Sequence, residues 1–352
     1  MTATAARHSR IDWVDYAKGI CIILVVMMHS TLGVEKAAGE LSWLNGFIEW
    51  ARPFRMPDFF LISGLFLGAR IAKPWRTYLD SKVLHFAYFY ILWMTIQFAM
   101  KSGPIIADGG MLGALEAYGM GFVQPYGTLW FIYLLAVFFV VTKLLHRVPA
   151  GLIFAVAGLL EIAPINTGWL TVDEFASRYV YFYAGFWMAR HVFDFAAGMN
   201  RLSTPALFSA LVVWGFANAL FVNQGISTFP VVSLILGFIG AGAVISSGVL
   251  LTRTRFAAAI RYCGENSIVI YLAFFVFMAA SRSFFLNHVP GHDLALVSLA
   301  VTAAGVIGPI LLFWAVRNTK AAFLFRRPAW ARLAAASETR PALAARISRT
   351  LA

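Results

Sequence analysis

Charge is scarce in this sequence. Only 12% of its 352 residues are Asp, Glu, Lys or Arg, whereas 61% are hydrophobic and the mean hydropathy is +0.76. A soluble domain carries about 25% charged and about 45–50% apolar residues. No stretch is long and polar enough to fold as a separate soluble domain. The composition therefore excludes an ordinary soluble protein and predicts a polytopic membrane protein.

Cysteine is also nearly absent, with Cys21 in a hydrophobic segment and Cys263 in a basic loop that we place in the cytoplasm. Two isolated cysteines provide neither a disulfide framework nor the ligand spacing of a zinc site. Phosphate-loop, dinucleotide, zinc-protease and Gly-x-Ser-x-Gly motifs are missing as well. The sequence thus predicts no metal and no bound cofactor.

Acidic residues are outnumbered by basic ones, 16 to 28, which gives a formal net charge of +12. Such a charge would suit a nucleic-acid ligand. In membrane proteins, however, Lys and Arg collect in cytoplasmic loops and attract anionic lipid. We therefore expect membrane lipid, and no nucleic acid, as the partner of the basic surface.

Ten hydrophobic segments can be placed along the chain, and the basic residues orient them. With a cytoplasmic N-terminus, all but six of the 28 Lys and Arg residues fall on the cytoplasmic side, as the positive-inside rule requires. The predicted fold is an all-α polytopic membrane protein with about ten transmembrane helices and cytoplasmic N- and C-termini. The six exceptions are Lys36, Arg52, Arg55, Lys101, Arg178 and Arg282. The segments are residues 17–34, 53–71, 80–100, 127–146, 149–164, 178–195, 204–223, 229–251, 266–286 and 294–316.

Three regions follow from these segments. Residues 1–12 form a short cytoplasmic arm, residues 13–316 the transmembrane domain, and residues 317–352 a basic tail. We expect the tail to be a surface helix or a disordered tether on the cytoplasmic side. The glycines of residues 101–126 predict an irregular outer loop.

One histidine lies deep in the first segment. Residues 19–28 read GICIILVVMM, with Lys18 directly before the run and His29 directly after it. Eleven residues are close to three helical turns, so both side chains project from one face, roughly 16 Å apart along the axis. His29 then lies near the middle of a bilayer core about 30 Å thick, where ionisable groups face a protein interior or a cavity. His29 is a candidate general base; the alternative is a buried histidine bonded to a neighbouring helix.

Two lysines are candidates for contact with an anionic ligand. Lys18 can pair with Asp15 on one helix face, either as an interfacial ion pair or on the wall of a cavity shared with His29. Lys82 follows a basic cluster at the start of the third segment. Membrane anchoring explains that cluster, and a ligand with several phosphates would also use it.

The second segment combines charge with helix-interrupting residues. Arg55 and Asp58 lie at its outer edge, where Pro53 and Pro57 interrupt regular helix, and we expect either a cavity or a structural ion pair. Ser63, next to a glycine, permits close approach of a helix or a ligand. Further candidates near segment ends are Trp130, for which an aromatic belt is the alternative, Arg178 and Tyr271.

Four stretches, in this order, resemble the membrane acyltransferase family called acyltransferase 3. Residues Trp13–Ser30 are similar to its first helix, in which a basic residue precedes the essential histidine by eleven positions. Residues Phe54–Gly68 are similar to its Phe-Phe-x-x-Ser-Gly motif, Gly127–Phe139 to its Leu-Trp-Phe segment, and Tyr262–Phe275 to its Gly-x-Asn-Ser segment. The chain departs from the family at Lys18, usually Arg, and at Phe274, where a histidine often stands.

The resemblance implies an acyltransferase of the inner (plasma) membrane. It would move an acyl group, most often acetyl, from acyl-CoA on the cytoplasmic side to a sugar hydroxyl of a cell-surface or exported glycan or glycolipid. His29 would be the general base, and Lys18 and Lys82 would hold the donor. Supporting roles would fall to Asp15, Arg55, Asp58, Ser63, Trp130, Arg178 and Tyr271.

Two alternatives stay open at this point. One is a proton-coupled transporter or flippase of a lipid or glycan, with His29 as proton relay. The absence of an internal repeat counts against it. The other is an acyltransferase-like protein without activity that serves as a partner in polysaccharide export.

Overall fold

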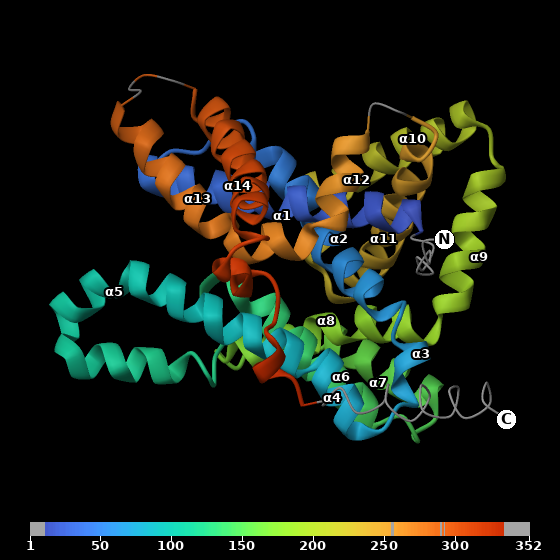
Figure 1. The fold of residues 1–352 in the computed structure, drawn as a ribbon. Helices are drawn as coiled ribbons and strands as arrows, with labels where there is room; N and C mark the ends of the chain where they lie inside the picture. Colours follow the sequence, from blue (N-terminus) through green and yellow to red (C-terminus); the bar gives the residue numbers. More distant parts are fainter. Residues whose placement is uncertain (1–10, 255–256, 289–290, 292, 334–352) are drawn as a thin grey trace, which may run out of the picture.

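The computed structural model describes residues 11–254, 257–288, 291 and 293–333. The described chain is helical throughout, with short turns and no strand, and is that of an all-α polytopic membrane protein (Figure 1). Each predicted segment coincides for most of its length with one α-helix, and three segments also reach into a shorter neighbouring helix, α3 (Gly68–Ile71), α4 (Trp75–Lys82) or α9 (Ala189–Arg201). The matching helices are α1 (Asp12–Ala38), α2 (Asn45–Gly64), α5 (Leu84–Met120), α6 (Trp130–Leu144), α7 (Ala150–Ile162), α8 (Leu170–Trp187), α10 (Thr204–Asn223), α11 (Pro230–Leu251), α13 (Ser267–His288) and α14 (Leu294–Val316).

Within the described residues, seven helices are long and apolar enough to cross a membrane: α1, α4 with α5, α6 with its leading turn, α10, α11, α13 and α14. Helix α7 has 13 residues, and α2 and α8 carry several charges. Ten spans and two cytoplasmic termini therefore stay predictions. Shorter elements complete the order: α3 (Gly68–Ile71), α4 (Trp75–Lys82), α9 (Ala189–Arg201), α12 (Ala258–Glu265) and the 3-10 turns η1 (Gly127–Leu129), η2 (Ile226–Thr228), η3 (Lys320–Leu324) and η4 (Ala329–Ala331).

Helix α1 lies at the centre of the fold and contacts α2, α11, α12, α13 and α14. Its residues Ala17, Cys21, Ile22 and Val26 are fully buried. Helix α12 approaches α1 so closely that a Cβ atom at Gly264 would overlap the backbone of Asp15. This close packing fixes the N-terminal part of the helix, next to Lys18.

Helices α2 and α8 meet through two glycines. A Cβ at Gly64 would overlap the carbonyl of Phe182, and one at Gly185 would overlap the carbonyl of Leu61. The close approach expected at Ser63 and Gly64 is therefore a helix contact. It fixes the position of the α2 residues that face the site.

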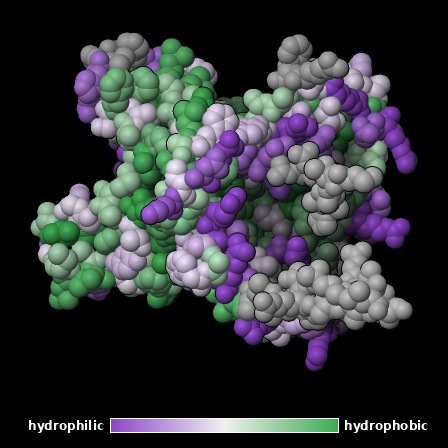
Figure 2. Space-filling model, viewed as in Figure 1, coloured by the Kyte–Doolittle hydropathy of each residue, from purple (hydrophilic) through white to green (hydrophobic). Residues whose placement is uncertain are grey.

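The prediction of an irregular loop at residues 101–126 is wrong. Helix α5 continues through Pro104 to Met120 and leaves helical geometry at Gly110, whose φ is +63°. Because glycine adopts this conformation without a Cβ penalty, the chain folds back as a helical arm rather than as a loop (Figure 1). Apolar side chains cover the arm, as Figure 2 shows, and Met111, Leu112 and Leu115 are exposed on it.

Two further boundaries differ from the prediction. Helix α8 ends at Trp187, and α9 continues in a new direction across residues that were placed in the sixth segment. The described part of the tail, residues 317–333, is neither a surface helix nor a tether. Arg327 donates to a carboxylate oxygen of Asp80 at 2.8 Å, and the backbone NH of Leu333 donates to the other at 2.7 Å. Residues 334–352 and most of the N-terminal arm, residues 1–10, lie outside the described residues.

Candidate active site

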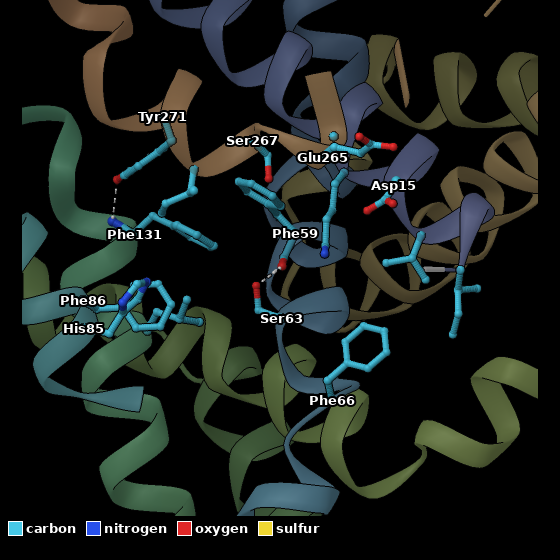
Figure 3. Close-up of a pocket in the computed structure, with 16 residues that line it drawn as sticks. Asp15, Phe59, Ser63, Phe66, His85, Phe86, Phe131, Glu265, Ser267 and Tyr271 are labelled. Carbon is cyan, nitrogen blue, oxygen red and sulfur yellow. Dashed lines mark hydrogen bonds between the residues drawn. The ribbon is translucent and has the colours of Figure 1, made fainter. Parts of the chain in front are cut away.

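Two cavities are lined by predicted site residues, and the larger of them has a volume of about 740 Å³. Five elements contribute its polar side chains: Asp15 and Lys18 come from α1, Ser63 from α2, His85 from α5, Glu265 from α12, and Ser267 and Tyr271 from α13 (Figure 3). The Nζ atom of Lys18 lies 5.9 Å from the ring centroid of Phe66, a further lining residue. The hydroxyl of Ser63 donates to the carbonyl of Phe59 at 2.8 Å. Lys18, Asp15 and Ser63, all predicted site residues, thus share one cavity.

The smaller cavity has a volume of about 230 Å³ and contains His29. Two predicted cations, Arg55 of α2 and Arg178 of α8, line it together with Trp130. Glu174 lies one turn before Arg178 and accepts from its Nε at 3.1 Å. The imidazole of His29 lies 5.4 Å, between ring centroids, from Phe274. This cavity brings together the predicted base and the predicted outer cations.

Three aromatic side chains line both cavities: Phe59, Phe131 and Tyr271. The rings of Phe59 and Phe131 stack at 4.6 Å, and Phe131 meets Tyr271 edge-on at 5.5 Å. The Tyr271 hydroxyl donates to the carbonyl of Thr128 at 2.5 Å and accepts from the NH of Phe131 at 3.1 Å. Lys18 and His29 therefore do not line one shared cavity, which was one of the two alternatives for Lys18. The two residues face neighbouring cavities that meet at this aromatic wall.

Two candidates lie elsewhere. The side chain of Asp58 is fully buried, lines neither cavity and accepts a hydrogen bond from the thiol of Cys21 at 2.5 Å. Of the two alternatives for Arg55 and Asp58, the ion pair does not form among the described residues. Arg55 instead lines the smaller cavity, its Nη2 atom 3.0 Å from the sulfur of Met28. Lys82 also lines neither cavity, and its Nζ lies 4.8 Å from the ring centroid of Phe139. Its contact with the donor stays a prediction.

Six polar residues of the two cavities are not among the predicted site residues. His85, Glu265 and Ser267 line the larger cavity, while Arg52, Thr128 and Glu174 line the smaller one. His85 stands three residues after Lys82, but nothing in the local sequence tells which of its neighbours the ring will face. Glu174 carries a weak signal, since a carboxylate four residues before Arg178 predicts a helical ion pair.

Within the described residues, no group of three or more His, Cys, Asp or Glu side chains is placed to hold a metal ion. The polar groups that line the two cavities are two imidazoles, three guanidinium groups, a lysine, hydroxyls and carboxylates. Such groups can transfer protons and bind charged substrates.

These features describe a helical membrane protein in which two polar cavities adjoin beside a half-buried histidine. The sequence comparison defines the kind: a family model described as an acyltransferase domain matches residues 11–315. The chain belongs to the acyltransferase 3 family, and the resemblance predicted from four sequence stretches is confirmed.

The curated relatives are distant but extend over most of the chain. "Nodulation protein NolL" of Sinorhizobium fredii (strain NBRC 101917 / NGR234) is 24% identical over 293 residues, which covers 77% of this chain and 79% of the relative. "Inner membrane protein YcfT" of Escherichia coli (strain K12) is 26% identical over 292 residues, covering 74% and 77%. No solved structure matches the chain.

Proposed function

We propose that this protein is an O-acyltransferase of the inner (plasma) membrane. It transfers an acyl group, most simply acetyl, from acyl-CoA to a sugar hydroxyl of a glycan or glycolipid. The observation that carries the proposal is the meeting of two cavities at one aromatic wall beside His29. Two cavities suit two substrates that approach from opposite sides.

The larger cavity is the proposed donor site. Its volume of about 740 Å³ falls in the range of about 300–1,000 Å³ typical of small-molecule sites. Lys18 supplies a positive charge for an anionic part of CoA, and Ser63 donates a hydrogen bond to the carbonyl of the wall residue Phe59. The thioester then reaches His29 when a ring of the wall turns aside.

The smaller cavity is the proposed acceptor site. His29 takes the proton of the sugar hydroxyl while the hydroxyl oxygen attacks the carbonyl carbon of the thioester. The new C–O bond forms, the C–S bond breaks, and the CoA thiolate leaves. The imidazolium returns its proton to the thiolate, so that ester, CoA thiol and neutral His29 result. The reaction balances without a metal, an oxidant or a bound cofactor.

Purified protein in detergent tests this function directly. With radiolabelled acetyl-CoA and a glycan extract from envelopes of a deletion strain, we expect label on the glycan and one free CoA thiol for each acetyl group transferred. Movement of substrate across vesicles without loss of the thioester would favour a transporter. Absence of both label transfer and thiol release would favour an inactive partner of an export complex.

A further inference from the structure

We propose that the acceptor is an anionic sugar, and that Arg55 binds its carboxylate or phosphate in the smaller cavity. This inference rests on the proposed function and narrows its substrate class. It requires that Arg55 be a buried cation with NH groups that lack a hydrogen-bond acceptor. It also requires that the smaller cavity be too small for acyl-CoA.

Arg55 is 6% exposed and has no strong partner among the described residues. Its Nη2 atom contacts the sulfur of Met28 at 3.0 Å, and its Nη1 atom makes a long bond of 3.4 Å to the carbonyl of Ile48. Its Nε atom is buried without a hydrogen-bond partner, and no carboxylate of the described chain forms an ion pair with it. A thioether is a weak acceptor, and a buried charge without a counterion is costly. An anionic ligand would supply the missing partner.

The other cations at this cavity are already compensated. Arg178 is paired with Glu174 at 3.1 Å, and Arg52, at the exposed rim, is paired with Glu49 at 3.1 Å. Arg55 is therefore the one arginine of this cavity lining that is not paired with a carboxylate of the described residues. A fork of guanidinium donors matches the two oxygens of a carboxylate or a phosphate.

A second observation comes from the distribution of charge along the chain. Only six of the 28 Lys and Arg residues are predicted to lie on the outer side or within the membrane. Three of these six, Arg52, Arg55 and Arg178, line the smaller cavity. A fourth, Lys101, has its Nζ next to Gly127, the residue before the lining residue Thr128. The cations that break the positive-inside pattern thus gather at one site, where they would attract an anionic substrate.

The cavity volume assigns the anion to the acceptor. About 230 Å³ is less than the range of about 300–1,000 Å³ of pockets that hold drug-sized molecules. A CoA molecule, with its nucleotide and its pantetheine arm, exceeds this space, whereas a single sugar ring suits it. Arg55 then holds the ring by its charged group and presents a hydroxyl to His29.

Matched pairs of acceptors test the proposal. Methyl β-glucuronide and its neutral amide share every hydroxyl and differ in charge, and methyl glucoside 6-phosphate with methyl glucoside forms the phosphate pair. In one of the two pairs, we expect the kcat/KM of the anionic member to be about ten- to a hundredfold higher than that of its neutral partner. The pair that shows this difference identifies the recognised group as a carboxylate or as a phosphate. Arg55→Gln should remove that preference by raising the KM for the anionic member. Arg55→Lys should keep part of it.

Lys36→Gln is the matched control, since Lys36 is an exposed outer cation that lines neither cavity; it should keep the full preference. Stabilisation of the wild type against heat by the anionic member, but not by its neutral partner, provides a readout that needs no turnover. If envelope glycans still accept acetyl groups, two results would overturn the proposal of an anionic acceptor. These are equal kcat/KM values within both pairs, or no difference in heat stabilisation between the members of a pair. A loss in Arg55→Gln that is equal for charged and neutral members would also overturn it. Failure of transfer to every acceptor would overturn the proposed function as well.

Discussion

His29→Ala is expected to lower the rate of acyl transfer by about 10²–10⁴-fold, the usual contribution of a general base. The imidazole lines the smaller cavity together with the three aromatic residues of the shared wall. Its removal costs a ring contact with Phe274 and no salt bridge, so the protein should still insert and fold. The measurement is acetyl transfer to envelope glycan by purified protein, with thermal unfolding recorded in parallel.

Phe274→Leu is the control for this experiment. It removes the same ring contact but keeps the base, so it should retain most of the activity. A His29→Ala variant that unfolds like the wild type and transfers acetyl at a near-normal rate would refute the assignment of the base. Comparable losses in the two variants would attribute the effect to packing instead.

Lys18→Ala is expected to raise the KM for acyl-CoA by roughly ten- to a hundredfold. The expected loss is that of a hydrogen bond to a charged group, about 1.5–3 kcal/mol. Lys18→Arg should keep much of the affinity, because the charge is retained. Titration of the donor at saturating acceptor gives the KM of each variant.

Asp15→Ala separates this role from a structural one. Asp15 stands one turn before Lys18 and lines the same cavity, so a merely structural pair would make both alanine variants unstable to a similar degree. Donor binding predicts a higher KM in Lys18→Ala with unfolding close to that of the wild type. Equal KM values in Lys18→Ala and wild type would return Lys18 to a structural role.

Most of the helical architecture could be predicted from the sequence, because long apolar runs in a chain with 12% charge have few other ways to satisfy their backbone. The errors occur where the backbone changes direction. Gly110 breaks α5 at a point where several neighbouring glycines do not, and α8 ends at Trp187 without a proline or glycine signal. Such breaks are set by packing between helices, which hydropathy does not report.

The candidate site, too, could be predicted from the sequence only in part. The spacing of Lys18 and His29 on one helix face could be derived from helix periodicity alone. The wall between them could not, because it consists of Phe59, Phe131 and Tyr271 from three different helices. Arg55 and Asp58 are three residues apart and were natural partners on a helix surface. In the fold, the carboxyl group turns to Cys21 of α1 and the guanidinium group turns to the smaller cavity.

The central claim of the proposed function is that an acyl group passes from acyl-CoA on one side of the membrane to a glycan on the other side. The most direct test uses proteoliposomes with envelope glycan extract sealed inside and radiolabelled acetyl-CoA, which does not cross the bilayer, added outside. The account predicts label on the enclosed glycan, free CoA thiol outside, and neither with His29→Ala. Label on glycan only when both substrates share one compartment would contradict it.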